Sequence, residues 1–327
     1  MKVSVTGVGS LFGQGIVKSL RLGRVAVRLQ GFDYFDAAVG LRWVDEGHLL
    51  PDVLTDEVDT DTWFDILCDH VSAHGSELLF VGVDFELPLL GARARQLHER
   101  TGCRAVLSPL DVIELCRDKY LTAQRLRELG LPAPQSLLPD VGVDRLADIL
   151  GFPIVVKPRT GSRGRDVVVV HDRDALASAL HRVPDPVVQE FIEGDDVEFS
   201  CGVLVLGGRV DAVSVLRRRL KDGNTVEAWS ESHPDLEDLC SRVALALGAD
   251  GPMNIQLRVG PSGPSIFEIN PRFSGTTVFR AHLGTNEPER ILRHHRGEAL
   301  APAARLLPGR ILRYYDELIE IEPGPQT

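Results

Sequence analysis

The first 110 residues alternate strand-like and helix-like segments, and this alternation constrains the fold more than any other feature. The strand-like segments are KVSVTG, VAVRLQGFD and ELLFVGVD, and each precedes a segment with helical spacing of its apolar residues. In the second helical segment, for example, Trp63, Ile66, Leu67 and Val71 recur at that spacing. Such alternation predicts a parallel, doubly wound sheet with helices on its faces.

A glycine-rich turn follows the first strand, in the stretch VTGVGSLFGQG. Gly9, Gly13 and Gly15 fit a GxxxGxG pattern, and Asp33 ends the second strand near where a ribose-binding acid would sit. Taken alone, this turn favours an NAD(P)-dependent oxidoreductase. The GxGxxG spacing is broken, however, because Phe12 stands where the third glycine is expected, and no catalytic Tyr-xxx-Lys is recognisable.

The character of the chain changes after the first domain. A helical stretch runs to Gly130, and a smaller lobe follows, with strands GFPIVVKPR, VVVVHD and PVVQEFIEG and one helix. From residue 197 the pattern is mostly that of antiparallel strands. We therefore expect three units, at 1–112, 113–188 and 189–327, that combine α/β and α+β architecture.

The two strands MNIQLRVG and SIFEINPR read as a hairpin around the turn-rich Gly260 to Pro264. If Gly260 opposes Pro264, Gln256 faces Glu268, and Asn270 shares that face. Three oxygen-bearing side chains would then converge without His or Cys. Such a set suits a hard cation, Mg²⁺ or Mn²⁺.

Lysine is rare in this chain: the five lysines are Lys2, Lys18, Lys119, Lys157 and Lys221, whereas arginine occurs 31 times. Lys157 ends an apolar strand and precedes a loop with Gly161, Ser162 and Gly164. An ammonium beside such a loop can hold phosphate oxygens, although the pattern is not a Walker A motif.

Together and in this order, the segments DKYLTAQRLRELGLPAP, FPIVVKPRTGSRG, VVQEFIEG, EFSCGVL, MNIQ and FEINPRFSG resemble the ATP-grasp superfamily. The resemblance is strongest to carboxylate–amine ligases and to the ATP-grasp domains of carbamoyl-phosphate synthetase. It covers residues 1 to about 310. It implies a Rossmann-like N-terminal domain followed by a two-lobed ATP-grasp fold.

The resemblance also implies roles for individual residues. Lys119 and Lys157 look like nucleotide-phosphate lysines, and the loop with Gly161, Ser162 and Gly164 looks like the flap over the phosphates. The hinge that contacts adenine would be Gln189, Glu190, Phe191 and Ile192. The acid that binds the ribose would be Glu198, with Asp196 as a competitor. The ligands of two metal ions would be Gln256, Glu268 and Asn270, and Arg272 would stabilise the transferring phosphoryl group.

The implied reaction phosphorylates a substrate carboxylate with ATP, and an amine then displaces phosphate to form an amide. No protein nucleophile is needed. A free-standing carbamoyl-phosphate-synthetase-like enzyme is the alternative within the superfamily. A nucleotide-binding module without activity is a third class, which the intact set of polar motif residues disfavours.

Substrate-binding residues are less constrained by the sequence. Asp84 and Glu86 follow a predicted parallel strand and would bind an amine or simply begin the next helix. Arg217 and Arg219 share a strand face and would either grip a substrate carboxylate or lie solvated at a strand edge. Ser274 and Gly275 belong to a loop that we expect near the acyl site.

Composition limits the partners. The formal charge of −11 leaves no basic footprint for nucleic acid, and no apolar run approaches the roughly 20 residues of a membrane span. Five scattered cysteines suggest reduced thiols in a cytoplasmic protein. We expect small-molecule substrates, and the resemblance is compatible with a homodimer.

Overall fold

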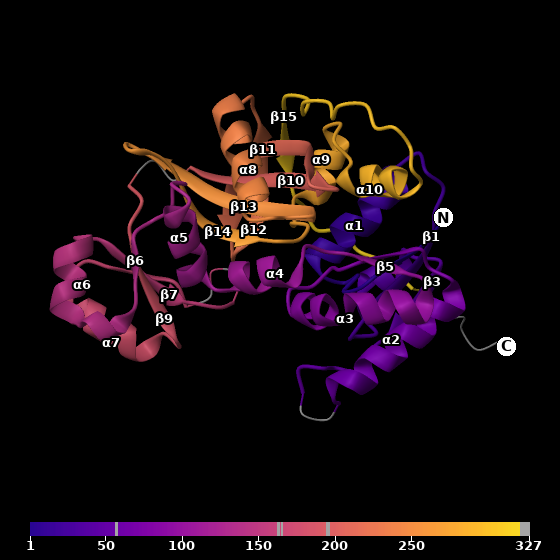
Figure 1. Cartoon of the computed structure of the whole chain (residues 1–327), viewed down its shortest axis with the longest axis horizontal. Coiled ribbons are helices and arrows are strands. Elements are labelled where there is room, and N and C mark those ends of the chain that lie inside the picture. Colours follow the sequence, from indigo (N-terminus) through magenta and orange to yellow (C-terminus); the bar gives the residue numbers. More distant parts are fainter. Residues whose placement is uncertain (56–57, 162–163, 165, 194–196, 321–327) are drawn as a thin grey trace.

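Three sheets organise the protein, as the computed structural model shows for residues 1–55, 58–161, 164, 166–193 and 197–320 (Figure 1). A parallel sheet lies at one end of the molecule, a small four-stranded sheet at the other end, and a six-stranded sheet between and above them. The predicted mixture of α/β and α+β architecture is confirmed.

The N-terminal sheet has five parallel strands in the order β3-β2-β1-β4-β5. Apolar side chains alternate between its two faces, so that α1 covers one face and α2 and α3 cover the other. The elements are β1 Lys2–Val5, α1 Leu11–Leu22, β2 Arg28–Asp33, the 3₁₀ helix η1 Val39–Arg42, β3 Glu46–Leu49, α2 Thr60–His74, β4 Leu78–Phe80, α3 Glu86–Thr101 and β5 Arg104–Val106.

Two helices connect this sheet to the rest of the chain: α4 (Leu110–Arg117) and α5 (Lys119–Glu128). The sequence predicted one helix here. The break occurs at Asp118, whose carboxylate accepts hydrogen bonds from the backbone N–H groups of Tyr120 (2.9 Å) and Leu121 (3.1 Å) and so starts a new helix. Lys119 is therefore held in the first turn of α5.

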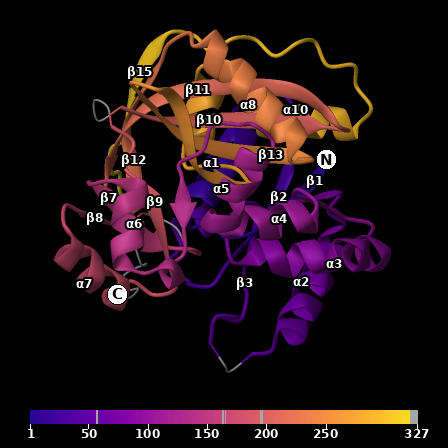
Figure 2. The ribbon, with the colours of Figure 1, turned by 60° about the vertical axis from the view of Figure 1, so that its left-hand side comes forward.

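The small lobe contains a four-stranded sheet in the order β6-β9-β7-β8, covered by two helices. Figure 2 shows α6 and α7 packed beside its strands. The elements are β6 Ser136–Leu137, the 3₁₀ helix η2 Pro139–Val141, α6 Val143–Leu150, β7 Ile154–Pro158, β8 Val168–Val170, α7 Arg173–Arg182 and β9 Pro186–Glu190.

The third sheet is antiparallel, with six strands in the order β14-β13-β10-β11-β12-β15. One face packs against α8, α4 and α5, and the other packs against α1 and α10. The elements are β10 Glu198–Leu206, β11 Arg209–Lys221, β12 Asn224–Ser230, α8 Pro234–Ala246, β13 Gly251–Gly260, β14 Gly263–Asn270, α9 Thr277–His282, α10 Glu287–His295 and β15 Gly309–Leu312.

Helix α1 therefore lies between the N-terminal sheet and the six-stranded sheet (Figure 1). The three sheets draw their strands from residues 2–106, 136–190 and 198–312, and the division at 112 and 188 stays a prediction. None of the helices in the described ranges is long and apolar enough to cross a membrane.

Candidate active site

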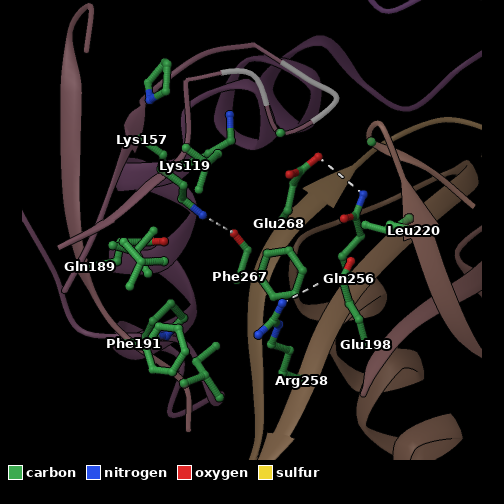
Figure 3. A pocket seen from close by; sticks show the side chains of 18 of the residues that line it. Lys119, Lys157, Gln189, Phe191, Glu198, Leu220, Gln256, Arg258, Phe267 and Glu268 are labelled. Carbon is green, nitrogen blue, oxygen red and sulfur yellow. Dashed lines mark hydrogen bonds and ion pairs between the residues drawn. The ribbon is translucent and has the colours of Figure 1, made fainter. Parts of the chain in front are cut away.

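A cavity of about 270 Å³ opens between the four-stranded sheet and the six-stranded sheet (Figure 3). The cavity is lined by most of the residues that the sequence assigned to nucleotide or metal binding: Lys119, Lys157, Gly161, Gly164, Gln189, Glu190, Phe191, Ile192, Glu198, Gln256 and Glu268. Ser162 and Asp196 lie outside the described residues, so their predicted roles stay predictions.

Two ammonium groups flank one side of this cavity. The Nζ of Lys157 donates to the Phe267 carbonyl (3.2 Å), and burial lowers the pKa of Lys157 to about 8. The Nζ of Lys119 donates to the Gly161 carbonyl (2.8 Å), and burial lowers its pKa as well. Both cations are desolvated, and among the described residues neither has a carboxylate within 4 Å, an arrangement that favours an incoming anion.

The glycine loop and the predicted hinge border the same cavity. Gly161 and Gly164 have φ of 109° and 64°, a left-handed backbone region that side chains rarely adopt. At the other side, β9 ends at Glu190, and the Gln189 side chain donates to the Ser136 hydroxyl (2.7 Å). This bond fixes the end of β9, where Phe191 and Ile192 then line the cavity.

Glu198 begins β10 and is clamped by two arginines. Arg218 donates to its Oε1, and Nη2 of Arg258 lies 3.5 Å from its Oε2. Arg218 also donates to Oε1 of Gln256 (2.7 Å), so one guanidinium joins the predicted ribose acid to a predicted metal ligand. Sequence reasoning missed Arg218.

The structure places Arg217 and Arg219 differently from Arg218. Arg217 pairs with Glu231 (2.9 Å) and lies over the Trp229 ring, and Arg219 pairs with Glu227 (2.6 Å). Neither lines the cavity, whereas Arg218 does. Strand alternation correctly separates Arg218 from its two neighbours, but the sequence does not say which face of β11 meets the cavity.

The hairpin of β13 and β14 carries the candidate metal ligands, and its predicted pairing of Gln256 with Glu268 is confirmed. The predicted turn is wrong by one position: Gly260 pairs with Gly263, not with Pro264. A bulge at Phe267 restores the predicted register. Its carbonyl is the group that accepts from Lys157.

The side chains of this hairpin converge on Glu268. Asn270 Nδ2 lies 2.9 Å and Gln256 Nε2 lies 3.4 Å from Glu268 Oε1. Carboxylate and amide oxygens fit Mg²⁺, which commonly takes one or two protein carboxylates and completes its shell with phosphate oxygens and water. Within the described ranges no three His, Cys, Asp or Glu residues form a metal-binding group. The set fits a cation that is held jointly with a nucleotide.

Arg272 joins the N-terminal domain to the six-stranded sheet next to this hairpin. Its guanidinium pairs with Asp84 at the end of β4, donates to Asn270 Oδ1 (3.2 Å), and lies 3.8 Å from the centroid of the Phe12 ring. Only 5% of its side chain is exposed. A cation is thus fixed beside the candidate metal ligands, between α1 and β14.

Glu86 does not lie beside Arg272 as Asp84 does. It is fully buried, and its carboxylate accepts hydrogen bonds from the hydroxyls of Thr6 and Tyr34 (2.6 Å for Tyr34). Burial raises the pKa of Glu86 to about 7. Because no surface of this carboxylate is open, the predicted contact with a substrate amine is not available in this structure.

Side chains of the protein itself bind the backbone N–H groups of the glycine-rich turn after β1. Asp33 Oδ2 accepts from the Gly9 N–H (2.7 Å), and the Ser10 hydroxyl caps α1 at Phe12 and Gly13. A Cβ at Gly13 would lie 2.1 Å from the Gly7 carbonyl oxygen, so this glycine allows the helix to approach the first strand. The acid expected on a dinucleotide ribose instead closes the turn, which disfavours the oxidoreductase hypothesis.

The loop after Arg272 rests on a buried polar network. Ser274, 4% exposed, accepts from Arg280 Nη1 (2.9 Å), and Arg280 pairs with Glu287 (2.7 Å) in the interior. The Gly275 carbonyl accepts from Arg313. Ser274 and Gly275 thus lie beside Arg272 and the N-terminal end of α1, and their predicted place near an acyl site stays a prediction.

Known proteins share these segments. The model of the ATP-grasp domain matches residues 116–276. The carbamoyl phosphate synthase large chain of Thermus thermophilus is 29% identical over 201 residues, which are 55% of this chain and 19% of that protein. The D-alanine–D-alanine ligase of Bacillus anthracis is 26% identical over 176 residues, 48% of this chain and 57% of the ligase. The chain thus spans only part of the curated relatives it matches.

Among solved structures, N5-carboxyaminoimidazole synthetase from Staphylococcus aureus complexed with ADP has a TM-score of 0.76 to this chain. The two are 12% identical, and the match covers 96% of this chain and 82% of the other. This likeness shows the fold, with its N-terminal parallel sheet and two-lobed continuation. The family model and the relatives lead to one conclusion: residues 116–276 of the chain form an ATP-grasp domain.

Proposed function

We propose that this protein is an ATP-dependent ligase that converts a substrate carboxylate to an acyl phosphate and joins it to an amine, releasing ADP and phosphate. One observation carries the proposal: the cavity brings two desolvated lysines, Lys119 and Lys157, to the same space as Glu268 and Gln256, with Arg272 beside them. This is the charge distribution that phosphoryl transfer from a nucleotide requires.

The nucleotide would lie with its base at the end of β9, between Gln189 and Ile192, and with its phosphates against the two lysines. Glu198 would accept from the ribose. Gln256, Glu268 and Asn270 would hold Mg²⁺ or Mn²⁺, two ions in the fullest form, which when bound would neutralise phosphate charge. The Gly161 to Gly164 loop would cover the phosphates.

The residues of the chain then position the reactants. A carboxylate oxygen attacks the γ-phosphorus, the bond to the β-phosphate oxygen breaks, and ADP leaves. Arg272 stabilises the charge on the transferred group, and the buried Ser274 network holds the adjoining loop. An uncharged amine next attacks the acyl carbon, the C–O bond to phosphate breaks, and an amide, phosphate and a proton are released.

A phosphate-release screen tests the proposal. The protein is incubated with Mg-ATP and pairs drawn from amino acids, other small acids, amines, and bicarbonate with ammonia. We expect phosphate and ADP in equal amounts with at least one pair. Release of AMP and pyrophosphate would contradict the acyl-phosphate mechanism, and activity with bicarbonate and ammonia alone would favour the carbamoyl-phosphate alternative.

The Glu268→Ala variant should lower this turnover by about 10²–10³-fold, because it removes the carboxylate on which the other two ligands converge. Glu231→Ala is a matched control, since Glu231 pairs with Arg217 outside the cavity. Equal activity of Glu268→Ala and the control would remove the metal assignment.

A further inference from the structure

Arg218 reaches from β11 across the six-stranded sheet to the candidate metal ligands. It pairs with Glu198 on β10, and its Nη2 also donates to Oε1 of Gln256 on β13 (2.7 Å). Only 9% of the Arg218 side chain and 11% of the Glu198 side chain are exposed. The bond to Gln256 is therefore a charge-assisted hydrogen bond that water hardly reaches, and such bonds are among the stronger ones in proteins.

This bond decides which end of the Gln256 amide faces the metal site. A guanidinium donates hydrogen bonds and accepts none, so the atom that meets Arg218 must be the amide oxygen. The amide nitrogen is left to face Glu268, and Gln256 Nε2 lies 3.4 Å from Glu268 Oε1 (Figure 3). A cation requires the oxygen. In this structure Gln256 therefore turns its donor, and not its ligand atom, toward the carboxylate.

Asn270 is arranged in the same way. Its Oδ1 accepts from Arg272 Nη2 (3.2 Å), and its Nδ2 donates to Glu268 Oε1 (2.9 Å). Both amides thus offer N–H groups to one carboxylate oxygen, and two arginines hold both amide oxygens. Of the three predicted metal ligands, only Glu268 has oxygens that no arginine within the described ranges holds.

We propose that Arg218 is a positioning residue that holds the Gln256 oxygen away from the metal site while no nucleotide is bound, so that a divalent cation binds firmly only together with the nucleotide. The inference rests on the metal site of the proposed ligase. To offer its oxygen to a cation, the Gln256 amide must reverse and lose its bond to Arg218. A nucleotide adds phosphate oxygens as further ligands, which offset that loss, whereas a free cation has no such compensation.

Charge repulsion would also lower the affinity for a cation, because Arg218 is itself positively charged. The two explanations differ in the role of Gln256. Repulsion acts whether or not position 256 carries an amide, whereas the proposed restraint exists only through the Gln256 oxygen. A double-mutant cycle over Arg218 and Gln256 separates them.

Electron paramagnetic resonance detects unbound Mn²⁺ and so measures its affinity for the full chain, with and without a non-hydrolysable ATP analogue. Without nucleotide, Arg218→Met should bind Mn²⁺ about tenfold to a hundredfold more tightly than wild type, as expected for release of a hydrogen bond to a charged group. Combining Arg218→Met with Gln256→Leu should remove most of this gain. A gain that persists in the double variant, or no gain in Arg218→Met, overturns the proposal.

Arg258→Met is the matched control. Arg258 also faces Glu198, with Nη2 3.5 Å from Oε2, but among the described residues it has no hydrogen bond to Gln256. The substitution removes a positive charge beside the same carboxylate, and it should raise the affinity for free Mn²⁺ by less than about threefold. A gain as large as that of Arg218→Met would show that charge excludes the cation, which contradicts the proposed restraint.

Gln256→Leu alone gives a result that does not depend on how well Arg218→Met folds. It should leave the affinity for free Mn²⁺ within about threefold of wild type and weaken Mn²⁺ binding in the presence of the ATP analogue about tenfold or more. Equal weakening in both states, or no weakening in either, overturns the proposal, because the oxygen would then serve the cation always or never.

Failure of this inference can be told apart from failure of the ligase function. If wild type binds Mn²⁺ with the ATP analogue and releases ADP, but Arg218→Met gains no affinity for free Mn²⁺, the ligase stands and the restraint fails. If the restraint is measured as expected but no pair of acid and amine supports ADP release, the restraint stands and the ligase proposal fails.

Discussion

The buried ammonium group of Lys157 suits the binding of an anion but lowers the stability of the folded protein. An ammonium group is buried at the end of an apolar strand, and burial lowers its pKa from 10.5 to about 8. Near neutral pH the folded, nucleotide-free protein therefore carries a charge that the unfolded chain would hydrate at less cost. A nucleotide phosphate is the partner that would offset this penalty.

We expect Lys157→Met to raise the free energy of unfolding by roughly 1–3 kcal/mol and to weaken ATP binding by at least about tenfold. Urea unfolding and calorimetric titration measure the two effects. Lys221→Met, at an exposed position, should change neither. A variant that loses stability and still binds ATP would contradict the assignment.

The residues of the cavity differ in how far the sequence could predict them. Lys119 and Lys157 stand out because lysine is rare here, and Glu268 stands out within a motif. Arg218 carries no such signal. Its contacts with Glu198 and Gln256 depend on how β11, β10 and β13 are registered side by side, and alternation within one strand does not contain that information.

Helix α1 offers a matched pair of glycines at the scale of an element. A Cβ at Gly13 would lie 2.1 Å from the Gly7 carbonyl oxygen, whereas a Cβ at Gly15 would meet only ordinary contacts at 3.8 Å. We expect Gly13→Ala to destabilise the protein by about 3 kcal/mol or more, and Gly15→Ala to stabilise it by about 0.5–1 kcal/mol through helix propensity.

Thermal unfolding of the two variants checks this prediction. Because both substitutions add one methyl group to the same helix, their difference isolates the close approach of α1 to the first β-to-α turn. Equal effects of the two would show that the turn can relax, and that Gly13 is not required for the packing.

A histidine cluster joins β3 to α2. The ring centroids of His48 and His70 are 4.1 Å apart, His74 Nδ1 lies 2.7 Å from the Ser76 hydroxyl, and burial lowers the pKa of His48 and His74 from 6.5. The electrostatic effect of the neighbouring His70 lowers the pKa of His48 further, and Glu46 acts in the opposite direction. The unfolded chain thus binds protons more readily than the folded protein.

Stability should therefore be complete above about pH 6.5 and decrease as the pH falls below that value. His48→Phe should make this decrease smaller, because it keeps the stacking on Phe32 and removes one titrating ring. Urea unfolding at pH 7.5 and pH 5.5 measures the difference between the two proteins. If wild type and His48→Phe lose the same free energy of unfolding between these pH values, the acid sensitivity does not arise from His48.

The hairpin shows why element boundaries were harder to predict than element types. The sequence indicates two apolar strands and a turn, and it correctly pairs Gln256 with Glu268. It did not locate the bulge at Phe267, which compensates for a turn one residue shorter than expected. Similarly, the capping carboxylate of Asp118 divides one predicted helix into two. In both cases a single local contact, not the apolar pattern, decides the geometry.

At the scale of the whole molecule, the ion pair of Asp84 with Arg272 connects the N-terminal sheet to the hairpin of the six-stranded sheet. The two residues are far apart in sequence, and their pairing requires the two sheets to be placed as observed. Sequence patterns predicted the sheets, but a contact between separate sheets arises only from their packing.

We expect Asp84→Asn to lower kcat about 10–100-fold while the Kd for ATP stays unchanged, because Arg272 would lose its anchor while the lysine side of the cavity is untouched. Steady-state ADP release and calorimetry give the two numbers. Asp36→Asn, on an exposed pair with Arg42 at 3.6 Å, is the control. An unchanged kcat would show that this contact between sheets is dispensable.

The scarcity of lysine also makes this chain a target for covalent mapping. Burial lowers the pKa of Lys157 to about 8, so its amine should be unusually nucleophilic in mildly alkaline solution, in the cavity where we propose that the nucleotide binds. An adenosine reagent bearing an amine-reactive group should therefore mark a tryptic peptide that contains Lys157 or Lys119, whose pKa burial also lowers, and excess ATP should protect it. Mass spectrometry of that peptide would locate the nucleotide before any substrate is known.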